Sequence, residues 1–133
     1  MTTASRNPVL ATALRGLALG RIVLGAGSLA APDTLARALG VRPTPELRYM
    51  TRIFGARAMA LGLGYLTAPA GERRRWQRLA LMVDVTDTVQ GAAHLARRDL
   101  PGPAAVALVA LTGGYMTVGA ARLLLPEDGE EPR

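Results

Sequence analysis

The sequence predicts an all-α fold: a four-transmembrane-helix antiparallel bundle with a short interfacial helix between its first and second spans. Half of the 133 residues are hydrophobic, which is high for a short soluble chain but ordinary for a compact multi-span membrane protein. No charged residue lies between Asp99 and Arg122, and roughly 20 apolar residues suffice to cross a bilayer. The alternative is a soluble bundle with unusually wide apolar faces.

Prolines and capping residues divide the chain into its elements. Asn7 followed by Pro8 is a helix start, and Thr44, Pro45 and Glu46 form a second one. The segment TLARALG is too short to span a bilayer and carries Arg37, which predicts an interfacial turn of helix. The expected elements are helix 8–31, interfacial turn 34–40, helix 45–68, basic loop 71–78, helix 79–98, turn 99–103 and a fourth helix ending at 125.

Residues 1–125 are expected to form a single four-helix membrane domain, followed by an acidic, disordered tail at 126–133. Arg15 and Arg21 interrupt the first apolar stretch, so we expect no cleavable signal peptide. The clustered arginines of the GERRRWQR loop are typical of a cytoplasmic connection. These features predict a multi-pass protein of the cell membrane with both termini cytoplasmic.

Arginine counts support this orientation. The side that carries the termini and the second loop would hold eight arginines: Arg6, Arg15, Arg73, Arg74, Arg75, Arg78, Arg122 and Arg133. The opposite side would hold five: Arg37, Arg42, Arg48, Arg97 and Arg98. The excess of positive charge normally lies in the cytoplasm.

Composition argues against several partners and chemistries. The sequence contains no cysteine, which excludes disulfides, thiolate nucleophiles and sulfur-ligated metals. Its net charge is +6, but the arginines are spread along the chain, aromatic residues make up only 4%, and no nucleic-acid motif occurs. Contact with anionic lipid head groups fits this basic balance better. The lipid bilayer is therefore the expected partner, and no nucleic acid is expected.

Four charged residues interrupt the predicted spans at one depth. Arg21, Arg57, Asp84 and Asp87 would lie ~20, ~17, ~16 and ~21 Å from the cytoplasmic end, at a rise of ~1.5 Å per residue. Each unpaired charge at this depth is unfavourable by about 2.5 to 3.5 kcal/mol. Because the set is charge-balanced, we expect these four side chains to form one connected network.

Three further residues, Arg52, Gln90 and His94, complete the candidate polar site. Arg52 is expected to reach the interface or to join the network through water, and His94 alone is more typical of an interface residue than of a metal ligand. Two interpretations of the site stay open. It is either a set of structural ion pairs that fixes helix packing, or a polar cavity that binds an anionic small molecule or passes protons.

Catalytic motifs are missing. The pair Asp84-x-x-Asp87 near arginines has a slight similarity to carboxylates that hold magnesium over a diphosphate, but no second acidic motif supports it. No Ser-His-Asp set, phosphate-binding glycine loop or HExxH motif occurs. We therefore expect no cofactor, no metal and no catalytic residue. The favoured function is a non-enzymatic helical module or accessory subunit.

The fourth predicted helix has more small residues than one packing face needs: Gly113, Gly114, Gly119, Ala120 and Ala121. Small residues mark the faces along which helices approach in lipid. This favours a second chain on that helix, either another copy or a partner membrane protein. The alternative is that all these glycines face the bundle's own interior.

Several motifs resemble an uncharacterised family of small bacterial four-helix integral membrane proteins. They are Leu19-Gly20-Arg21, Ala31-Pro32, the stretch Arg52 to Arg57 with Gly62 and Gly64, and Asp84-x-x-Asp87. The general outline is also similar, more distantly, to DoxX-like membrane proteins. The resemblance covers roughly residues 13 to 95 and implies a fold and a bacterial inner-membrane location, but no reaction.

Overall fold

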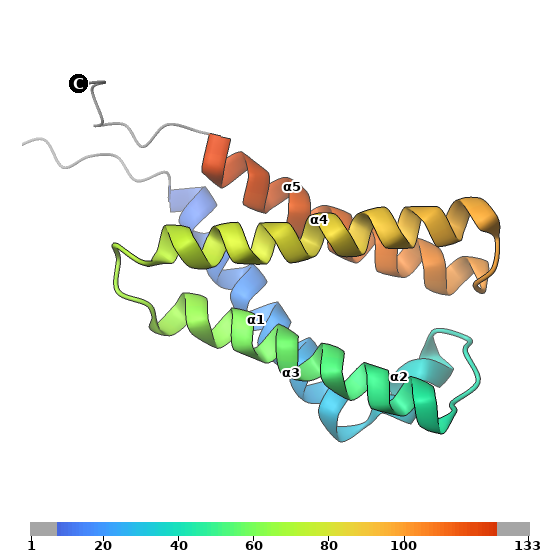
Figure 1. The fold of residues 1–133 in the computed structure, drawn as a ribbon. Coiled ribbons are helices and arrows are strands. Elements are labelled where there is room, and N and C mark those ends of the chain that lie inside the picture. Colours follow the sequence, from blue (N-terminus) through green and yellow to red (C-terminus); the bar gives the residue numbers. More distant parts are fainter. Residues whose placement is uncertain (1–7, 125–133) are drawn as a thin grey trace, which may run out of the picture.

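The computed structural model describes residues 8–124, and these residues form five helices and no strand (Figure 1). The helices are α1 (Pro8–Ala30), α2 (Pro32–Ala38), α3 (Pro45–Thr67), α4 (Arg73–Arg97) and α5 (Gly102–Leu124). The all-α prediction is confirmed. The expected cap at Asn7 and the expected tail at 126–133 lie outside the described residues.

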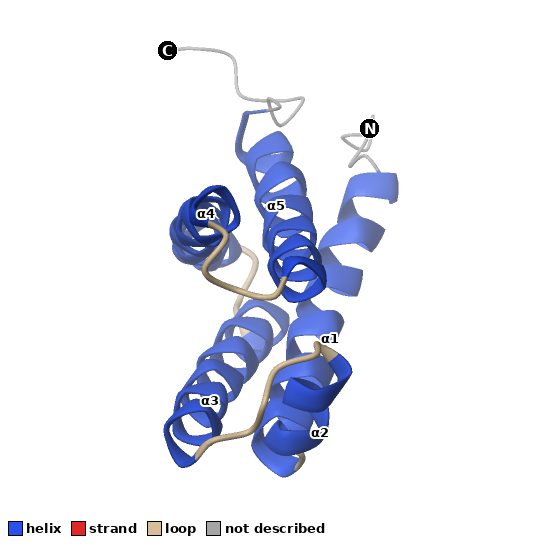
Figure 2. Ribbon diagram, turned by 90° about the vertical axis from the view of Figure 1, so that its right-hand side faces the viewer, coloured by secondary structure: helices blue, strands red, loops and turns tan. Residues whose placement is uncertain are grey.

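The four long helices form two antiparallel hairpins. α1 packs mainly against α3, and α4 packs mainly against α5, whereas contact between the two pairs is much sparser (Figure 2). The start of α1, the end of α5 and the α3–α4 turn lie at one end of the molecule (Figure 1). The short helix α2 and the α4–α5 turn lie at the opposite end. We call α1 with α3 the first hairpin and α4 with α5 the second.

Small residues allow the backbones of the first hairpin to come very close. A Cβ placed on Gly25 would lie 2.6 Å from the Gly55 carbonyl oxygen, and one on Gly62 would lie 2.6 Å from the Ala18 carbonyl oxygen. Ser28 is fully buried in the same interface and donates its hydroxyl to the Leu24 carbonyl at 2.8 Å. Close approach of two helix backbones through glycine and serine is typical of helices that pack in lipid.

The connection between α1 and α3 is fixed by two local contacts. The Thr44 hydroxyl caps α3 by accepting the Leu47 amide at 3.1 Å, as its position before Pro45 predicts. Asp33 in the first turn of α2 accepts two hydrogen bonds from Arg48, at 2.9 and 2.7 Å. This forked contact holds α2 against the start of α3.

Two expected boundaries were wrong. The GERRRWQR segment is not a loop to residue 78, because α4 begins at Arg73 and a tight turn at 68–72 makes the connection. Arginine is a good helix former, so the run of arginines propagates the helix. The interfacial helix begins at Pro32 rather than at 34, since proline is readily accommodated at the first helical position.

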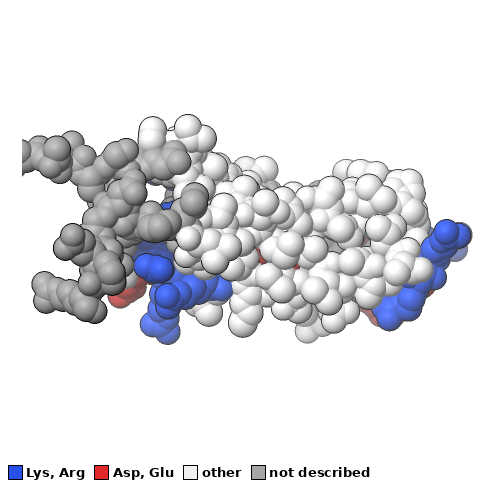
Figure 3. All heavy atoms as spheres, turned by 90° about the horizontal axis from the view of Figure 1, so that it is seen from above, with Lys and Arg blue, Asp and Glu red and all other residues white. Residues whose placement is uncertain are grey.

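Every long helix exposes large apolar side chains. Large exposed side chains include Val9 and Val23 of α1, Met50 and Ile53 of α3, Met82 and Val89 of α4, and Val106 and Leu108 of α5. Figure 3 shows arginine side chains at the two ends of one face and, between them, a broad belt that is almost entirely uncharged, with only traces of acidic atoms visible in its gaps. The buried apolar core, by contrast, is built chiefly from alanines.

Candidate functional site

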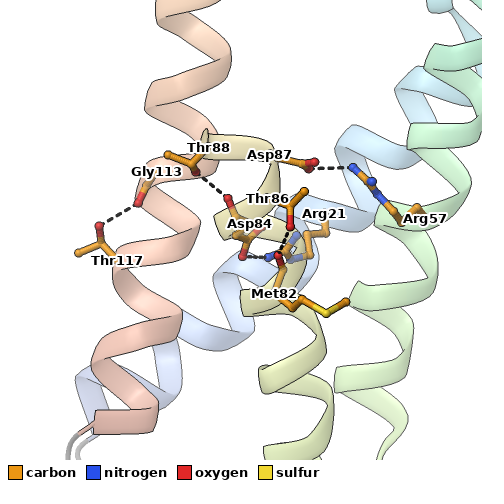
Figure 4. Close-up of polar contacts among 9 residues, drawn as sticks. All are labelled: Arg21, Arg57, Met82, Asp84, Thr86, Asp87, Thr88, Gly113 and Thr117. Carbon is orange, nitrogen blue, oxygen red and sulfur yellow. Dashed lines mark hydrogen bonds and ion pairs between the residues drawn. The ribbon is translucent and has the colours of Figure 1, made fainter. Parts of the chain in front are cut away.

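The centre of the candidate site is an ion pair between the two hairpins. Arg21 on α1 donates from Nη2 to Oδ2 of Asp84 on α4 at 2.5 Å (Figure 4). The side chains are only 13% and 5% exposed, so both charged groups are removed from the surface. The pair joins elements that otherwise touch little, because α1 and α4 belong to different hairpins.

Tyr115 of α5 completes the environment of Arg21. The guanidinium carbon lies 4.3 Å from the centroid of the tyrosine ring, within the range of a cation–π interaction. A Cβ on Gly20 would lie 2.6 Å from the Tyr115 hydroxyl, so this glycine leaves room for the phenol. Sequence reasoning missed this residue, although Tyr115 is the single aromatic residue of α5.

A second ion pair links α3 to α4. Arg57 donates from Nη2 to Oδ2 of Asp87 at 2.7 Å, and its guanidinium carbon lies 5.6 Å from the centroid of the Phe54 ring. These side chains are more open than the first pair, with Arg57 44% and Asp87 25% exposed. Both arginines therefore come from the first hairpin and both aspartates from the second.

The four charges pair as expected, but as two separate bridges. Positions 84 and 87 are about 60° apart around α4, so Asp84 meets α1 and Asp87 meets α3 (Figure 4). No hydrogen bond joins the two pairs within residues 8–124. Thr86 and Thr88 on the same helix donate to backbone carbonyls of α4, at 2.8 and 2.6 Å, and add nothing to the bridges.

The three other predicted site residues take no part in the two bridges. Arg52 is exposed, and its Nε donates to the Leu29 carbonyl at 3.4 Å. Gln90 is exposed on α4. His94 lies at the far end of α4, where its Nδ1 is 2.7 Å from Oδ1 of Asp99. The other carboxylate oxygen of Asp99, Oδ2, accepts from Nε of Arg97 at 3.2 Å. His94 thus stabilises the α4–α5 turn instead of joining the polar site.

Two small cavities adjoin the buried ion pair. The larger, about 40 Å³, runs along the Arg73 end of the interface between the hairpins, and its mostly apolar lining includes the polar residues Arg21, Asp84, Tyr115 and Gln77. The smaller, about 20 Å³, lies on the other side of the pair and reaches the second bridge. Gln77 is only 8% exposed and was not singled out by sequence, because it lies in the stretch expected to be a loop.

The charged groups of the site pair with one another. Among residues 8–124, no group of three or more His, Cys, Asp or Glu side chains lies close enough together to hold a metal ion. Each aspartate of the layer instead faces a guanidinium. Such pairs bridge helices and, where cavities adjoin them, present a carboxylate to water.

Comparison with known proteins finds no similar sequence or structure. Family models, curated proteins and solved structures contain no match to this chain. The resemblance to small bacterial four-helix membrane proteins therefore stays a prediction, carried by the motifs in α1, α3 and α4.

Proposed function

We propose that the chain is a four-span integral membrane protein with both termini in the cytoplasm. Its role is that of a non-enzymatic helical module or accessory subunit. In this proposal the two hairpins cross the bilayer and are held together by ion pairs between them. The carrying observation is the distribution of polarity: every long helix exposes large apolar side chains, while the mid-helix charges pair between helices.

The surface supports this proposal against that of a soluble bundle. Two helices, α1 and α5, are long and apolar enough to cross a membrane by length and composition. Only 17% and 11% of their apolar windows are buried inside the structure, unlike the core helix of a soluble domain. Exposed apolar surface of this extent is typical of surfaces that contact a membrane or another protein, and lipid would shield all four long helices from water at once.

The two long helices that are less apolar, α3 and α4, carry three of the four charges of the two bridges, namely Arg57, Asp84 and Asp87. An arginine or aspartate unpaired at the bilayer centre is unfavourable by about 2.5 to 3.5 kcal/mol, and pairing offsets much of this. The bridges therefore make α3 and α4 compatible with lipid. The arginine-rich start of α4 is placed on the cytoplasmic side by the positive-inside rule, together with both termini.

The same proposal includes a partner on α5. Gly114 is exposed and a Cβ there would meet nothing within 4 Å, so this position is open to a second copy or to another membrane protein. The neighbouring glycines do not share this face. A Cβ on Gly113 would contact Thr88, and one on Gly119 would contact Leu81, both in α4.

Alkaline extraction of membranes tests insertion, and a reporter fused to the C-terminus tests orientation. We expect the protein to stay in the membrane pellet and the reporter to be active on the cytoplasmic side. Release into the soluble fraction would contradict insertion. A reporter active on the outer face would contradict the topology while leaving insertion intact.

A second candidate function is proton handling at the buried ion pair. The observation that favours it is the pair of cavities, which flank Arg21 and Asp84. A volume of about 40 Å³ suits a few water molecules but not an organic anion, so the geometry favours protons over small-molecule ligands.

A further inference from the structure

Gln77 has no protein partner although it is buried. Its side chain is only 8% exposed, it lines the larger cavity, and it makes no side-chain hydrogen bond to any other residue within 8–124. No fully buried side-chain nitrogen or oxygen atom within residues 8–124 lacks a hydrogen-bond partner, so the polar atoms of this amide are reachable from outside the protein. Native proteins normally supply a partner to a largely buried carboxamide, and water in the cavity can be that partner.

Other polar atoms face the same cavity. Asp84 uses Oδ2 for Arg21, and neither its Oδ1 nor the Tyr115 hydroxyl makes a hydrogen bond within the described residues. The cavity thus offers amide, hydroxyl and carboxylate groups around one space. Its charges balance, since Arg21 and Asp84 are the charged groups that line it. Neutral, hydrogen-bonding ligands suit such a site better than a free ion.

The volume identifies the ligand class. One water molecule needs roughly 10 to 15 Å³ of such space and two to four polar partners. The larger cavity, about 40 Å³, therefore accommodates two or three water molecules. The smaller, about 20 Å³, accommodates one.

We propose that two or three water molecules fill the larger cavity, link the Gln77 amide to the Asp84 carboxylate, and make Asp84 a proton-exchanging site for the Arg73 end of the bundle. Gln77 lies four positions after Arg73, or ~6 Å along α4, so the chain of water ends one helical turn from that end. This proposal rests on the membrane location proposed above, because the two ends of the bundle face different sides only when the helices cross a membrane.

The proton transfer involves no other reactant. A proton passes from the water chain to Asp84, which becomes a neutral acid, and the reverse transfer restores the carboxylate. Arg21, which lies over the Tyr115 ring, takes no part in the transfer. The remaining charged groups that face this region are Arg57 of α3 and Asp87 of α4, which pair with each other.

Two glycine variants in one helix test the water chain. A Cβ on Gly119 would lie 3.6 Å from Leu81 Cδ1, an ordinary contact, so Gly119→Ala narrows the cavity without a clash. Gly114→Ala is the matched control, since a Cβ there meets nothing. In lipid nanodiscs, we expect nuclear magnetic cross-relaxation between water and the Gln77 side-chain amide in the wild type and in Gly114→Ala, and its loss in Gly119→Ala.

No cross-relaxation at Gln77 in the folded wild type would overturn the proposal, and so would an unchanged signal in Gly119→Ala. A second readout is deuterium exchange of the Arg21 guanidinium. We expect Gln77→Leu to slow this exchange and Gln90→Leu, at an exposed position of the same helix, to leave it unchanged. Equal exchange in the two variants would also overturn the proposal.

Failure of the membrane proposal gives a different result. Dissolved oxygen concentrates in lipid and broadens the signals of side chains that face it. If the signals of Val23 and Met82 are not broadened, the membrane location fails. The cross-relaxation at Gln77 then still reports whether the cavity holds water.

Discussion

The guanidinium of Arg21 and the carboxylate of Asp84 lie 2.5 Å apart, although 63 positions separate the two residues in the chain. This contact joins α1 to α4, and the Arg57–Asp87 contact joins α3 to the same helix. Because the hairpins otherwise share few contacts, these bridges are the main polar connection between them. The stability of the assembled bundle should therefore depend on them.

Asp84→Asn should destabilise the protein far more than Asp33→Asn. The first change leaves Arg21 buried without its counter-charge, an effect of about 3 to 5 kcal/mol for a buried pair. Asp33 pairs with Arg48 at a more exposed site, where solvent weakens the interaction. Thermal unfolding in detergent and the amount of folded protein in membranes measure the difference. Similar losses in the two variants would argue that Asp84 is solvated in the native state.

Gly62→Ala should separate α1 from α3. The added Cβ would lie 2.6 Å from the Ala18 carbonyl oxygen, which is backbone and cannot move aside cheaply. Overpacking of this kind is unfavourable by about 1 to 3 kcal/mol.

Gly27→Ala on the exposed side of α1 is the control for that change. A Cβ there meets nothing, and replacing a helical glycine by alanine stabilises by roughly 0.4 to 1 kcal/mol. The midpoint of thermal unfolding should fall for Gly62→Ala and rise for Gly27→Ala. A fall of equal size in both would contradict the close packing of the first hairpin.

The α2–α3 contact should make stability depend on pH. The hydrogen bonds from Arg48 lower the pKa of Asp33 below its ordinary value of 3.8. The unfolded chain therefore binds this proton at a higher pH than the folded protein does, so the contribution is complete above 3.8 and is lost as the pH falls through the lowered pKa. Wild type should lose stability over this acidic range more steeply than Asp33→Asn. Parallel pH profiles of the unfolding midpoint would contradict this.

Local signals in the sequence predicted much of the fold. Thr44 before Pro45 gives the start of α3 because a capping hydroxyl and a proline act within one turn. Depth and charge balance predicted that Arg21 and Arg57 pair with Asp84 and Asp87, but as one connected network; they did not predict which arginine meets which aspartate. The contribution of Tyr115 was not predicted either, because cation–π contact depends on how α5 is rotated against α1. Gln77 was missed for a related reason: helix propensity extended α4 back to Arg73, into the stretch expected to be a loop.

His94 shows the limit of assigning a residue by the face of a helix. It continues the stripe of Asp84 and Asp87 along α4, yet it binds Asp99, five positions later in the turn. The imidazole of His94 pairs with the nearby carboxylate of Asp99 at the end of α4 and not with Asp84 or Asp87. The turn that places Asp99 beside the imidazole includes Arg98 at a positive φ of 56°.

Cysteine cross-linking tests the proposed partner face of α5. In this cysteine-free chain, Gly114→Cys should form a disulfide-linked dimer in membranes, because the position is exposed and open. Gly119→Cys, directed at Leu81 inside the second hairpin, should not. If neither variant forms a dimer although a thiol probe labels Gly114→Cys, α5 faces lipid there rather than a second copy.

The most direct measurement is a double-mutant cycle on Arg21 and Asp84 in lipid. We expect Arg21→Met and Asp84→Leu each to lower the free energy of unfolding by about 3 to 5 kcal/mol, and the double variant to recover most of the loss, since an apolar pair leaves no buried charge. The same cycle on Arg57 and Asp87, which are 44% and 25% exposed, should give a smaller coupling. Single losses that simply add in the Arg21–Asp84 double variant would show that the two residues do not join the hairpins.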